Sequence, residues 1–159
     1  MIVIRCETGD DIHVNGDTLI DAELSGLNLH RALLERQNLG GANLSGSVLR
    51  SARLEGANFA GANLQQANLA AVEAADANFV EADLTEAMMR SGCFERVNFT
   101  GANRNGAKVG GATFAGAILN GADLRCQGLE KADLRGACAD AATRWPDAFN
   151  ATDYGIDIR

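Results

Sequence analysis

The sequence predicts an all-β solenoid, a chain that coils repeatedly around one continuous core. Three observations carry this prediction. Leu or Phe falls on nearly every fifth residue from Leu19 to Leu134, and 25 consecutive five-residue units can be counted through Ala139. The central residue is Leu in 15 units and Phe in five. Ala stands two residues before the centre in 17 units, and Gly stands two residues after it in 11.

A period of five fits neither a straight helix nor a straight strand. An α-helix advances about 100° per residue, so residues five apart would be scattered around its surface. In a straight strand, side chains alternate between faces, and every second Leu would face water. The chain must therefore turn once per unit. The recurrent Gly supplies the bend, and the small Ala lets neighbouring walls approach closely.

The order of residues within a unit carries a family resemblance. Asn or Asp precedes the centre, as in Ala42-Asn43-Leu44, Ala62-Asn63-Leu64, Ala82-Asp83-Leu84 and Ala132-Asp133-Leu134. Such tandem units resemble the pentapeptide-repeat family over about four-fifths of the chain. The resemblance implies a right-handed quadrilateral β-helix of about six coils, in which four units close one square coil. At about 4.8 Å between stacked strands, the rod is expected to be roughly 30 Å long.

Stacking of residues twenty apart has two consequences for side chains. Phe59, Phe79 and Phe99 are expected to form an aromatic column inside one wall. An amide ladder is expected outside it, because identical side chains stack favourably along a solenoid. Its members are Asn38, Asn58, Asn78 and Asn98.

The two ends of the solenoid are expected to be capped, because an open coil exposes unpaired strand edges. We divide the chain into an N-terminal capping hairpin (1–16), the β-helix (17–141) and a C-terminal cap or tail (142–159). The hairpin comprises residues 2–6 and 12–14. Thr143-Arg144-Trp145-Pro146 resembles the ending of many bacterial members, and Trp145 and Phe149 are expected to plug the core. Residues 154–158 could instead be an association segment, so the protein is a monomer or a dimer through an end cap.

Composition points to a cytoplasmic protein, and the family resemblance implies a bacterial one. No apolar run is long enough to span a membrane, and no basic-then-apolar leader opens the sequence. Cysteine occurs at four positions without paired spacing: Cys6, Cys93, Cys126 and Cys138. We therefore expect a reducing compartment, with no disulfide, no metal site and no membrane partner.

No catalytic constellation is present in the sequence. Of the two histidines, His13 lies in the N-terminal cap, and His30 on an outer wall has no carboxylate or cysteine at a spacing that would make a dyad. Glycine pairs such as Gly110-Gly111 belong to the repeat, and no phosphate-binding loop follows them. We predict a non-enzymatic protein without a cofactor, and no catalytic, cofactor-binding or metal residue is assigned.

Two central positions depart from the pattern. Arg104 stands between Leu84 and Leu124 in its stack, where a guanidinium would be buried at a cost of several kcal/mol. The favoured interpretation is a local bulge that lets Arg104 reach outward, and the alternative is a displaced loop that forms part of a partner site. Ala74 is the second departure, and we expect an inward sag or a void beside it.

Charge is distributed unevenly over the stacked walls. The net charge is −7, and residues 17–141 hold 15 acids and 11 bases. The wall centred on Leu29, here the basic wall, carries Arg31, Arg50, Arg90, Lys108 and Lys131 against Glu130. The next wall, the mixed wall, holds Glu35, Glu55, Glu73, Asp76, Glu95 and Asp133 interleaved with Arg36, Arg53, Arg96 and Arg135. The acidic wall, centred on Leu24, carries Glu23, Asp83, Glu86 and Asp123.

These features favour a structural or protein-interaction scaffold with an unknown target and an unassigned binding site. The family resemblance supplies the alternative, a DNA-mimicking modulator of DNA gyrase or topoisomerase of the quinolone-resistance type. The acids do not form one unbroken strip, which speaks against mimicry. Direct binding of nucleic acid is not expected, since five bases on one wall have no aromatic residues between them for stacking.

Overall fold

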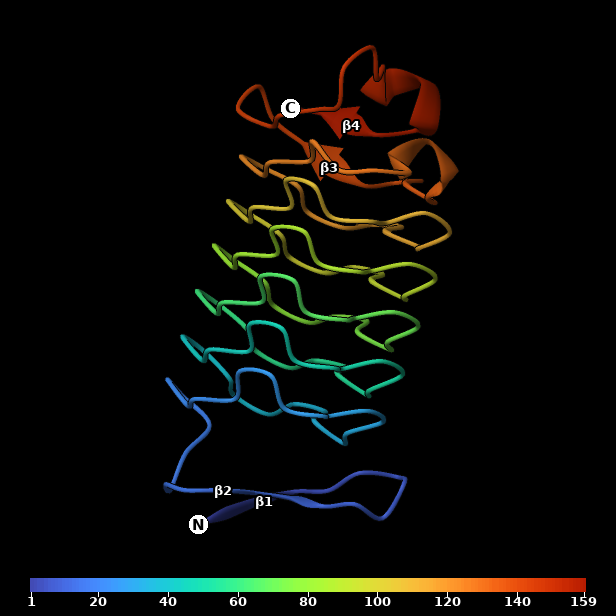
Figure 1. The fold of residues 1–159 in the computed structure, drawn as a ribbon. Coiled ribbons are helices and arrows are strands. Elements are labelled where there is room, and N and C mark those ends of the chain that lie inside the picture. The colour runs from blue at the N-terminus through green and yellow to red at the C-terminus, as the bar shows by residue number, and fades with distance from the viewer.

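Backbone hydrogen bonds link each five-residue unit to the unit twenty residues further along the chain. A computed structural model describes residues 1–159 and shows these units stacked as the coils of a rod (Figure 1). The Leu44 N–H donates to the Asn63 carbonyl at 2.7 Å, and the Asn43 N–H donates to the Ala22 carbonyl at 2.9 Å. Parallel bridges of this kind run from Glu23–Asn43 to Asp83–Asn103 and beyond. The predicted stacking of residues twenty apart is confirmed over these coils.

Regular secondary structure is sparse, because a unit of five residues pairs at one position and then turns. The named elements are β1 (Ile2–Ile4), β2 (Ile12–Val14), η1 (Leu129–Lys131), β3 (Cys138–Ala139), η2 (Ala151–Tyr154) and β4 (Asp157–Ile158). None of the helices is long and apolar enough to cross a membrane. The rod is therefore built from isolated bridges and turns rather than from continuous strands.

In the regular coils, the turn between units has a left-handed backbone two residues after the centre, from Asp21 to Gly121. Gly41 has φ 68° there, and the non-glycine Arg36 has φ 58°. The Asn before the centre stabilises the same turn, since Asn58 Oδ1 accepts the Ala60 N–H at 3.1 Å. The repeated Gly and Asn thus have separate roles. Gly permits the backbone angle, and Asn satisfies an N–H that the inter-coil ladder leaves free.

The amide ladder forms over three coils. Asn58 Nδ2 donates to Asn38 Oδ1 at 2.8 Å, and Asn78 Nδ2 donates to Asn58 Oδ1 at 2.9 Å. Asn98 does not extend this ladder. Its Oδ1 accepts the N–H and the hydroxyl of Thr100, at 3.0 and 2.7 Å. The predicted ladder is confirmed as far as Asn78.

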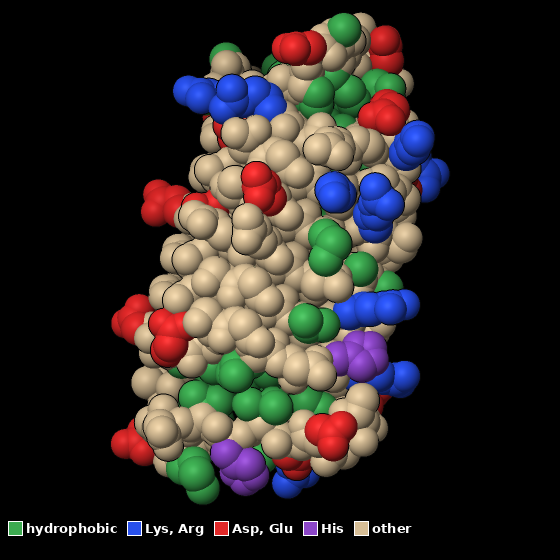
Figure 2. Space-filling model, in the orientation of Figure 1, with side chains coloured by type: hydrophobic (Ala, Val, Ile, Leu, Met, Phe, Trp, Pro, Cys, Tyr) green, Lys and Arg blue, Asp and Glu red, His purple; other side chains and the backbone are tan.

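Inward positions hold the apolar side chains, and the outside of the rod is largely polar. The central residues from Leu24 to Leu124 are fully buried. In Figure 2 the visible hydrophobic side chains gather mainly toward the two ends of the rod. Large exposed hydrophobic residues at the ends are Met1, Val3, Ile20 and Ile158. Two others, Val48 and Met88, lie on the flank.

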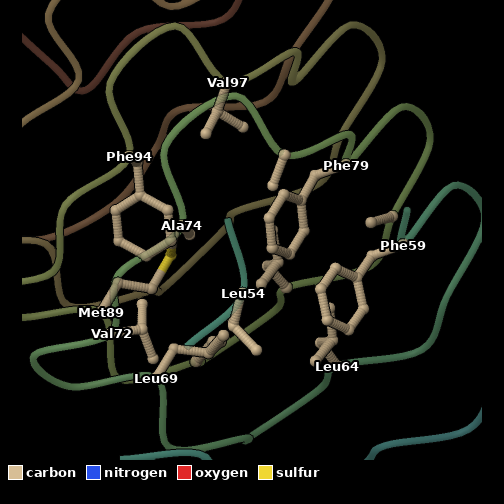
Figure 3. Packing of buried hydrophobic residues seen from close by; sticks show 14 of the residues in the cluster. Leu54, Phe59, Leu64, Leu69, Val72, Ala74, Phe79, Met89, Phe94 and Val97 are labelled. Atoms are coloured by element: carbon tan, nitrogen blue, oxygen red, sulfur yellow. The ribbon is translucent and has the colours of Figure 1, made fainter. Parts of the chain in front are cut away.

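The predicted aromatic column fills the core. The rings of Phe59 and Phe79 stack with centroids 4.8 Å apart (Figure 3). The centroids of Phe79 and Phe99 are 5.3 Å apart. Ala74 is fully buried, and none of the cavities in the structure is lined by it. Val72 occupies the small inward position of the same unit, where Ala is usual, and is also fully buried. The larger Val72 therefore fills part of the volume that the smaller Ala74 leaves in the core.

Gly92 provides a test of this packing. A Cβ at Gly92 would lie 2.5 Å from Cε2 of Phe94, although Ala is the usual residue at this small inward position. We expect Gly92→Ala to destabilise the fold by about 1–3 kcal/mol, the usual cost of overpacking a core. Chemical denaturation would measure the change. Gly110→Ala is the matched control, because its Cβ meets nothing within 4 Å, and an equal loss in both variants would contradict the packing argument.

The repeat register is interrupted in the last coil, which the regular sequence pattern did not predict. Gln127 bridges Lys108, nineteen residues earlier instead of twenty. The Gly111 N–H donates to the Lys131 carbonyl at 3.1 Å, so Lys131 is the residue stacked on Gly110. Three residues lie between Gln127 and Lys131, whereas only Val109 lies between the equivalent residues Lys108 and Gly110. The extra residues form η1, which Figure 1 shows in orange. Leu129 is nevertheless buried, as its central position predicts.

Irregular segments lie at both ends of the rod. At the N-terminus, β1 and β2 pair antiparallel, with Val3 opposite His13. At the C-terminus, β4 pairs in parallel with β3 through Cys138–Asp157 and Ala139–Ile158. Three partly buried aromatic rings stack beside the core in this segment, with centroid distances of 5.4 and 4.5 Å. These are Trp145, Phe149 and Tyr154.

Candidate functional site: the outer walls

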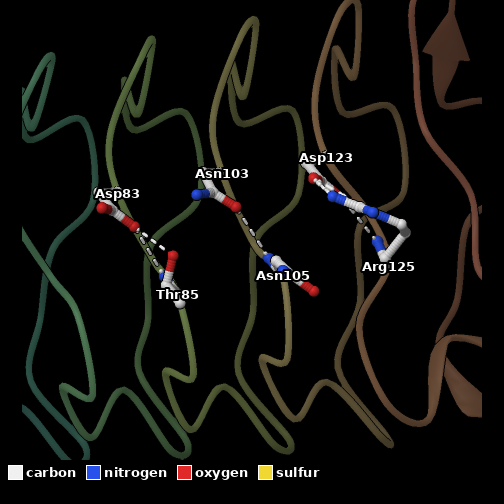
Figure 4. Close-up of polar contacts among 6 residues, drawn as sticks. All are labelled: Asp83, Thr85, Asn103, Asn105, Asp123 and Arg125. Carbon is white, nitrogen blue, oxygen red and sulfur yellow. Dashed lines mark hydrogen bonds and ion pairs between the residues drawn. The ribbon is translucent and has the colours of Figure 1, made fainter.

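The acidic wall is a network of short polar contacts within its own turns (Figure 4). Asp83 Oδ1 accepts the N–H and the hydroxyl of Thr85 at 3.0 and 2.6 Å. Burial raises the pKa of Asp83, but hydrogen bonds from Thr85 and Gln65 outweigh it, so the net pKa is lowered. Arg125 Nη2 lies 2.6 Å from Asp123 Oδ2 and lowers the pKa of Asp123. Of the four acids of this wall, only Asp123 pairs with a cation, and that pair interrupts the acidic surface.

The mixed wall neutralises its charges in a similar way. Arg96 Nε lies 2.8 Å from Asp76 Oδ1 in the coil below and lowers the pKa of that carboxyl. Arg135 Nη2 lies 2.7 Å from Asp133 Oδ2 and lowers the pKa of Asp133 to about 2. Arg53 pairs with Glu35 at 2.9 Å. These pairs are exposed, and each contributes little to stability. Their effect is to cancel opposite charges along the wall.

The basic wall differs because most of its cations have no partner. Arg31 pairs with Glu7. The other four form no ion pair and no side-chain hydrogen bond: Arg50, Arg90, Lys108 and Lys131. The two exposed apolar residues of the flank, Val48 and Met88, occupy the bridging position of this same wall. Sequence analysis identified the cations but missed these two residues, although an apolar residue at an outward position is a readable signal.

The two histidines lie apart and form no catalytic pair. His13 is exposed on β2. His30 lies on the basic wall, where its Nδ1 is 2.8 Å from the Arg50 carbonyl oxygen. No group of three or more His, Cys, Asp or Glu side chains is arranged to hold a metal ion. The surface of the rod thus offers flat polar walls with no cluster of reactive groups.

Arg104 is buried in the core, and the predicted bulge is wrong. The Arg104 N–H donates to Asp123 O at 2.9 Å, so the backbone keeps the regular register. The side chain is 0% exposed, which also rules out a displaced loop at a partner site. Its Cζ lies 4.2 Å from the ring centroid of Phe99 and 4.8 Å from that of Phe114. Two aromatic faces therefore take the place of the acid that the sequence lacks.

The buried guanidinium of Arg104 is electrostatically unsatisfied. Its Nε, Nη1 and Nη2 atoms have no hydrogen-bond partner. Burial lowers the pKa of Arg104 to about 10, which leaves the group charged at neutral pH. Cation–π contacts in a dry site contribute about 2 kcal/mol or more each, and they offset part of the several kcal/mol that burial of an unpaired charge costs. The sequence analysis did not predict this arrangement, because a bulge that exposes the side chain has a lower free-energy cost than burial of an unpaired charge.

Comparison with known proteins establishes the class to which this rod belongs. A family model described as Pentapeptide repeats matches residues 28–66, 62–103, 93–136 and 110–143. The chain is a member of the pentapeptide-repeat family, whose fold is the right-handed quadrilateral β-helix. A search of curated protein sequences found no significant match.

Solved structures agree with this assignment. The pentapeptide repeat protein Rfr23 from the cyanobacterium Cyanothece 51142 is 28% identical, with 77% of this chain and 90% of that chain covered and a TM-score of 0.55. A trypsin-treated variant of QnrB1, a plasmid-mediated fluoroquinolone resistance protein, is 18% identical, with 93% and 86% covered and a TM-score of 0.53. A second such variant is 14% identical, with 86% and 89% covered and a TM-score of 0.52. The likeness to QnrB1 shows the fold alone.

Proposed function

We propose that this protein is a non-enzymatic scaffold that binds a protein partner through its basic wall. The observation that carries the proposal is the contrast between walls. The mixed wall pairs most of its acids with its own arginines and the acidic wall pairs Asp123 with Arg125, whereas Arg50, Arg90 and Lys108 have no ion-pair partner. Opposite charges that are paired within a wall largely cancel, so they produce little electrostatic field that could attract a partner. Unpaired cations supply that field and favour a partner with an acidic face.

Two exposed apolar residues also favour the basic wall as the binding surface. Val48 is 36% exposed and Met88 is 39% exposed, and Asn68 lies between them in the bridging ladder. Protein interfaces combine apolar contacts at the centre with charged or polar groups around them, and Met and Arg are enriched there. Val48 and Met88 flanked by Arg50 and Arg90 match this composition. A rigid repeat surface also loses little conformational entropy on binding.

Site-specific photocrosslinking tests the proposal wall by wall. Asn68→p-benzoylphenylalanine places the crosslinker on the basic wall, and Asn63→p-benzoylphenylalanine places it at the equivalent position of the acidic wall. The two sites are matched, since each Asn accepts the N–H two residues later, at 3.0 and 3.1 Å. We expect a discrete protein adduct from position 68 that is lost in a Val48→Ser/Met88→Ser background. Equal adducts from both positions, or none from 68, would reject the basic wall as the binding surface.

A second candidate function is modulation of DNA gyrase by mimicry of DNA. It is supported by the net charge of −7 and by the likeness in fold to QnrB1, which is described as a fluoroquinolone resistance protein. The pairing of Asp123 with Arg125 and of Asp76 with Arg96 argues against it, because these contacts interrupt the acidic surface. We therefore rank it below the scaffold.

A further inference from the structure

The interruption of the repeat creates a polar notch at the C-terminal end of the basic wall. The notch has a volume of about 370 Å³. No apolar residue lines it; its lining is Arg90, Gly110, Gln127, Gly128, Glu130 and Lys131. It lies where the chain carries extra residues between Gln127 and Lys131, beyond the regular coils. A second cavity of about 300 Å³ shares Gln127 with the notch and is also lined by Lys108, Gly106 and Glu86.

The groups that line the notch have no partners within the protein. Arg90, Gln127 and Lys131 make no side-chain hydrogen bond and no ion pair. The backbone N–H groups of Gly110 and Gly128 donate to no acceptor in the chain. In regular units, the N–H equivalent to that of Gly110 is bonded by an Asn or Asp side chain, as the Ala70 N–H is by Asn68. Lys108 replaces that Asn in the unit of Gly110, so a donor is left available.

Two glycines keep the floor of the notch open. Gly128 has φ 82°, and a Cβ there would lie 3.0 Å from the Cα and N atoms of Gly110. Gly128 is therefore required for this close approach of the two backbones. Gly110 is different, because a Cβ at this position meets nothing within 4 Å. Because Gly110 has no Cβ, there is open space at the surface here, and packing of the fold does not require it.

We propose that the notch binds a small molecule bearing a diphosphate group. Arginine and lysine side chains together with free backbone N–H groups form the usual donor set for phosphate oxygens. The cations Arg90, Lys131 and the neighbouring Lys108 are spread over two adjoining cavities, which suits two linked phosphoryl groups better than one. Glu130 lines the notch and Glu86 lines the second cavity, and each carboxylate opposes an anion. Neutralising Glu130 should therefore tighten binding. The site shares Arg90 and Lys108 with the basic wall, but it lies apart from Val48 and Asn68.

Titration calorimetry with inorganic pyrophosphate tests the proposal on the full chain. We expect Arg90→Gln/Lys131→Gln to weaken binding by about tenfold or more, because two charge-assisted contacts are lost. Gly110→Ala keeps every charge but fills the floor, and it should weaken binding by about threefold or more through steric exclusion. Glu130→Gln should strengthen binding. Arg50→Gln, on the same wall but outside the notch, should leave the affinity unchanged.

The outcomes separate this site from general attraction to a positive surface. Thermal unfolding of each variant confirms that the fold is retained. Absence of binding to pyrophosphate at about 1 mM would overturn the proposal. So would an equal loss in Arg50→Gln, which would show diffuse attraction by the wall, or binding of a single-stranded oligonucleotide without binding of pyrophosphate. The photocrosslinking result on the basic wall is independent, since positions 48, 68 and 88 lie outside the notch.

Discussion

Phe79→Ala is expected to lower the free energy of unfolding by about 3–5 kcal/mol, the cost of truncating a large, fully buried aromatic residue. Phe79 is the middle ring of the column, stacked on Phe59 and Phe99 and in edge contact with Phe94 at 6.4 Å. Truncation would leave a cavity and remove three aromatic contacts at once. Equilibrium urea denaturation followed by circular dichroism would measure the loss.

Phe79→Leu is the matched control for this prediction. Leu is the commonest central residue of the repeat, so the variant should keep the coil and lose less than about 1.5 kcal/mol. A second comparison is Phe59→Ala, at the end of the column, where one ring stacks instead of two. If Phe59→Ala and Phe79→Ala destabilise the protein equally, the column does not act as a stacked unit.

Arg104→Leu is expected to stabilise the protein by about 1–3 kcal/mol. The substitution removes a charged group with three unpartnered nitrogen atoms and restores the Leu of the same stack at positions 84 and 124. Two cation–π contacts are lost and reduce the gain. For a domain of this size, about 1 kcal/mol raises the melting temperature by roughly 2–4 °C. A clear fall in melting temperature would contradict this account of Arg104.

The dependence on pH provides an independent check. Burial lowers the pKa of Arg104 in the folded state to about 10, whereas the unfolded chain keeps the ordinary, higher value. Above this pH the unfolded state binds more protons than the folded state, so the stability contributed by this group increases with pH. The advantage of Arg104→Leu over the natural protein should be constant below about pH 10 and shrink above it. If the stability difference between Arg104→Leu and the natural protein stays the same at higher pH, burial of the charge is not what stabilises the variant.

The sequence predicted the regular part of the fold because one physical constraint repeats. A large residue every five positions must return to the same interior, which predicts a chain that turns once per unit. The family resemblance implies four units per coil, and the pairing of Leu44 with Asn63 and of Asn43 with Ala22 follows from the two together. The column from Phe59 to Phe99 follows from the same register.

Departures from the repeat could not be read in the same way. The sequence analysis placed Arg104 outside the core, because burial of an unpaired guanidinium is unfavourable. It did not predict that the rings of Phe99 and Phe114 would contact the guanidinium. The extra residues before Lys131 were missed because Leu129 preserves the five-residue spacing while the backbone around it shifts. Both depend on three-dimensional neighbours that the spacing does not encode.

The proposed binding surface was only half visible in the sequence. Stacking by twenty residues grouped the cations of the basic wall, and the structure shows that Arg50 and Arg90 remain without ion-pair partners. The acids were grouped equally well, but their pairing with neighbouring arginines depends on side-chain conformation. Which wall keeps a free charge is therefore a property of the folded surface and not of composition.

A DNA gyrase supercoiling assay with purified protein, with and without ciprofloxacin, tests the central claim most directly. The account holds that the rod is a scaffold whose acidic surface is interrupted by its own arginines, as at Asp123 and Asp76. It predicts that supercoiling and its inhibition by the drug are unchanged at stoichiometric protein and at about tenfold excess protein. Inhibition of supercoiling, or protection from ciprofloxacin, would contradict the account and assign the acidic wall to mimicry of DNA.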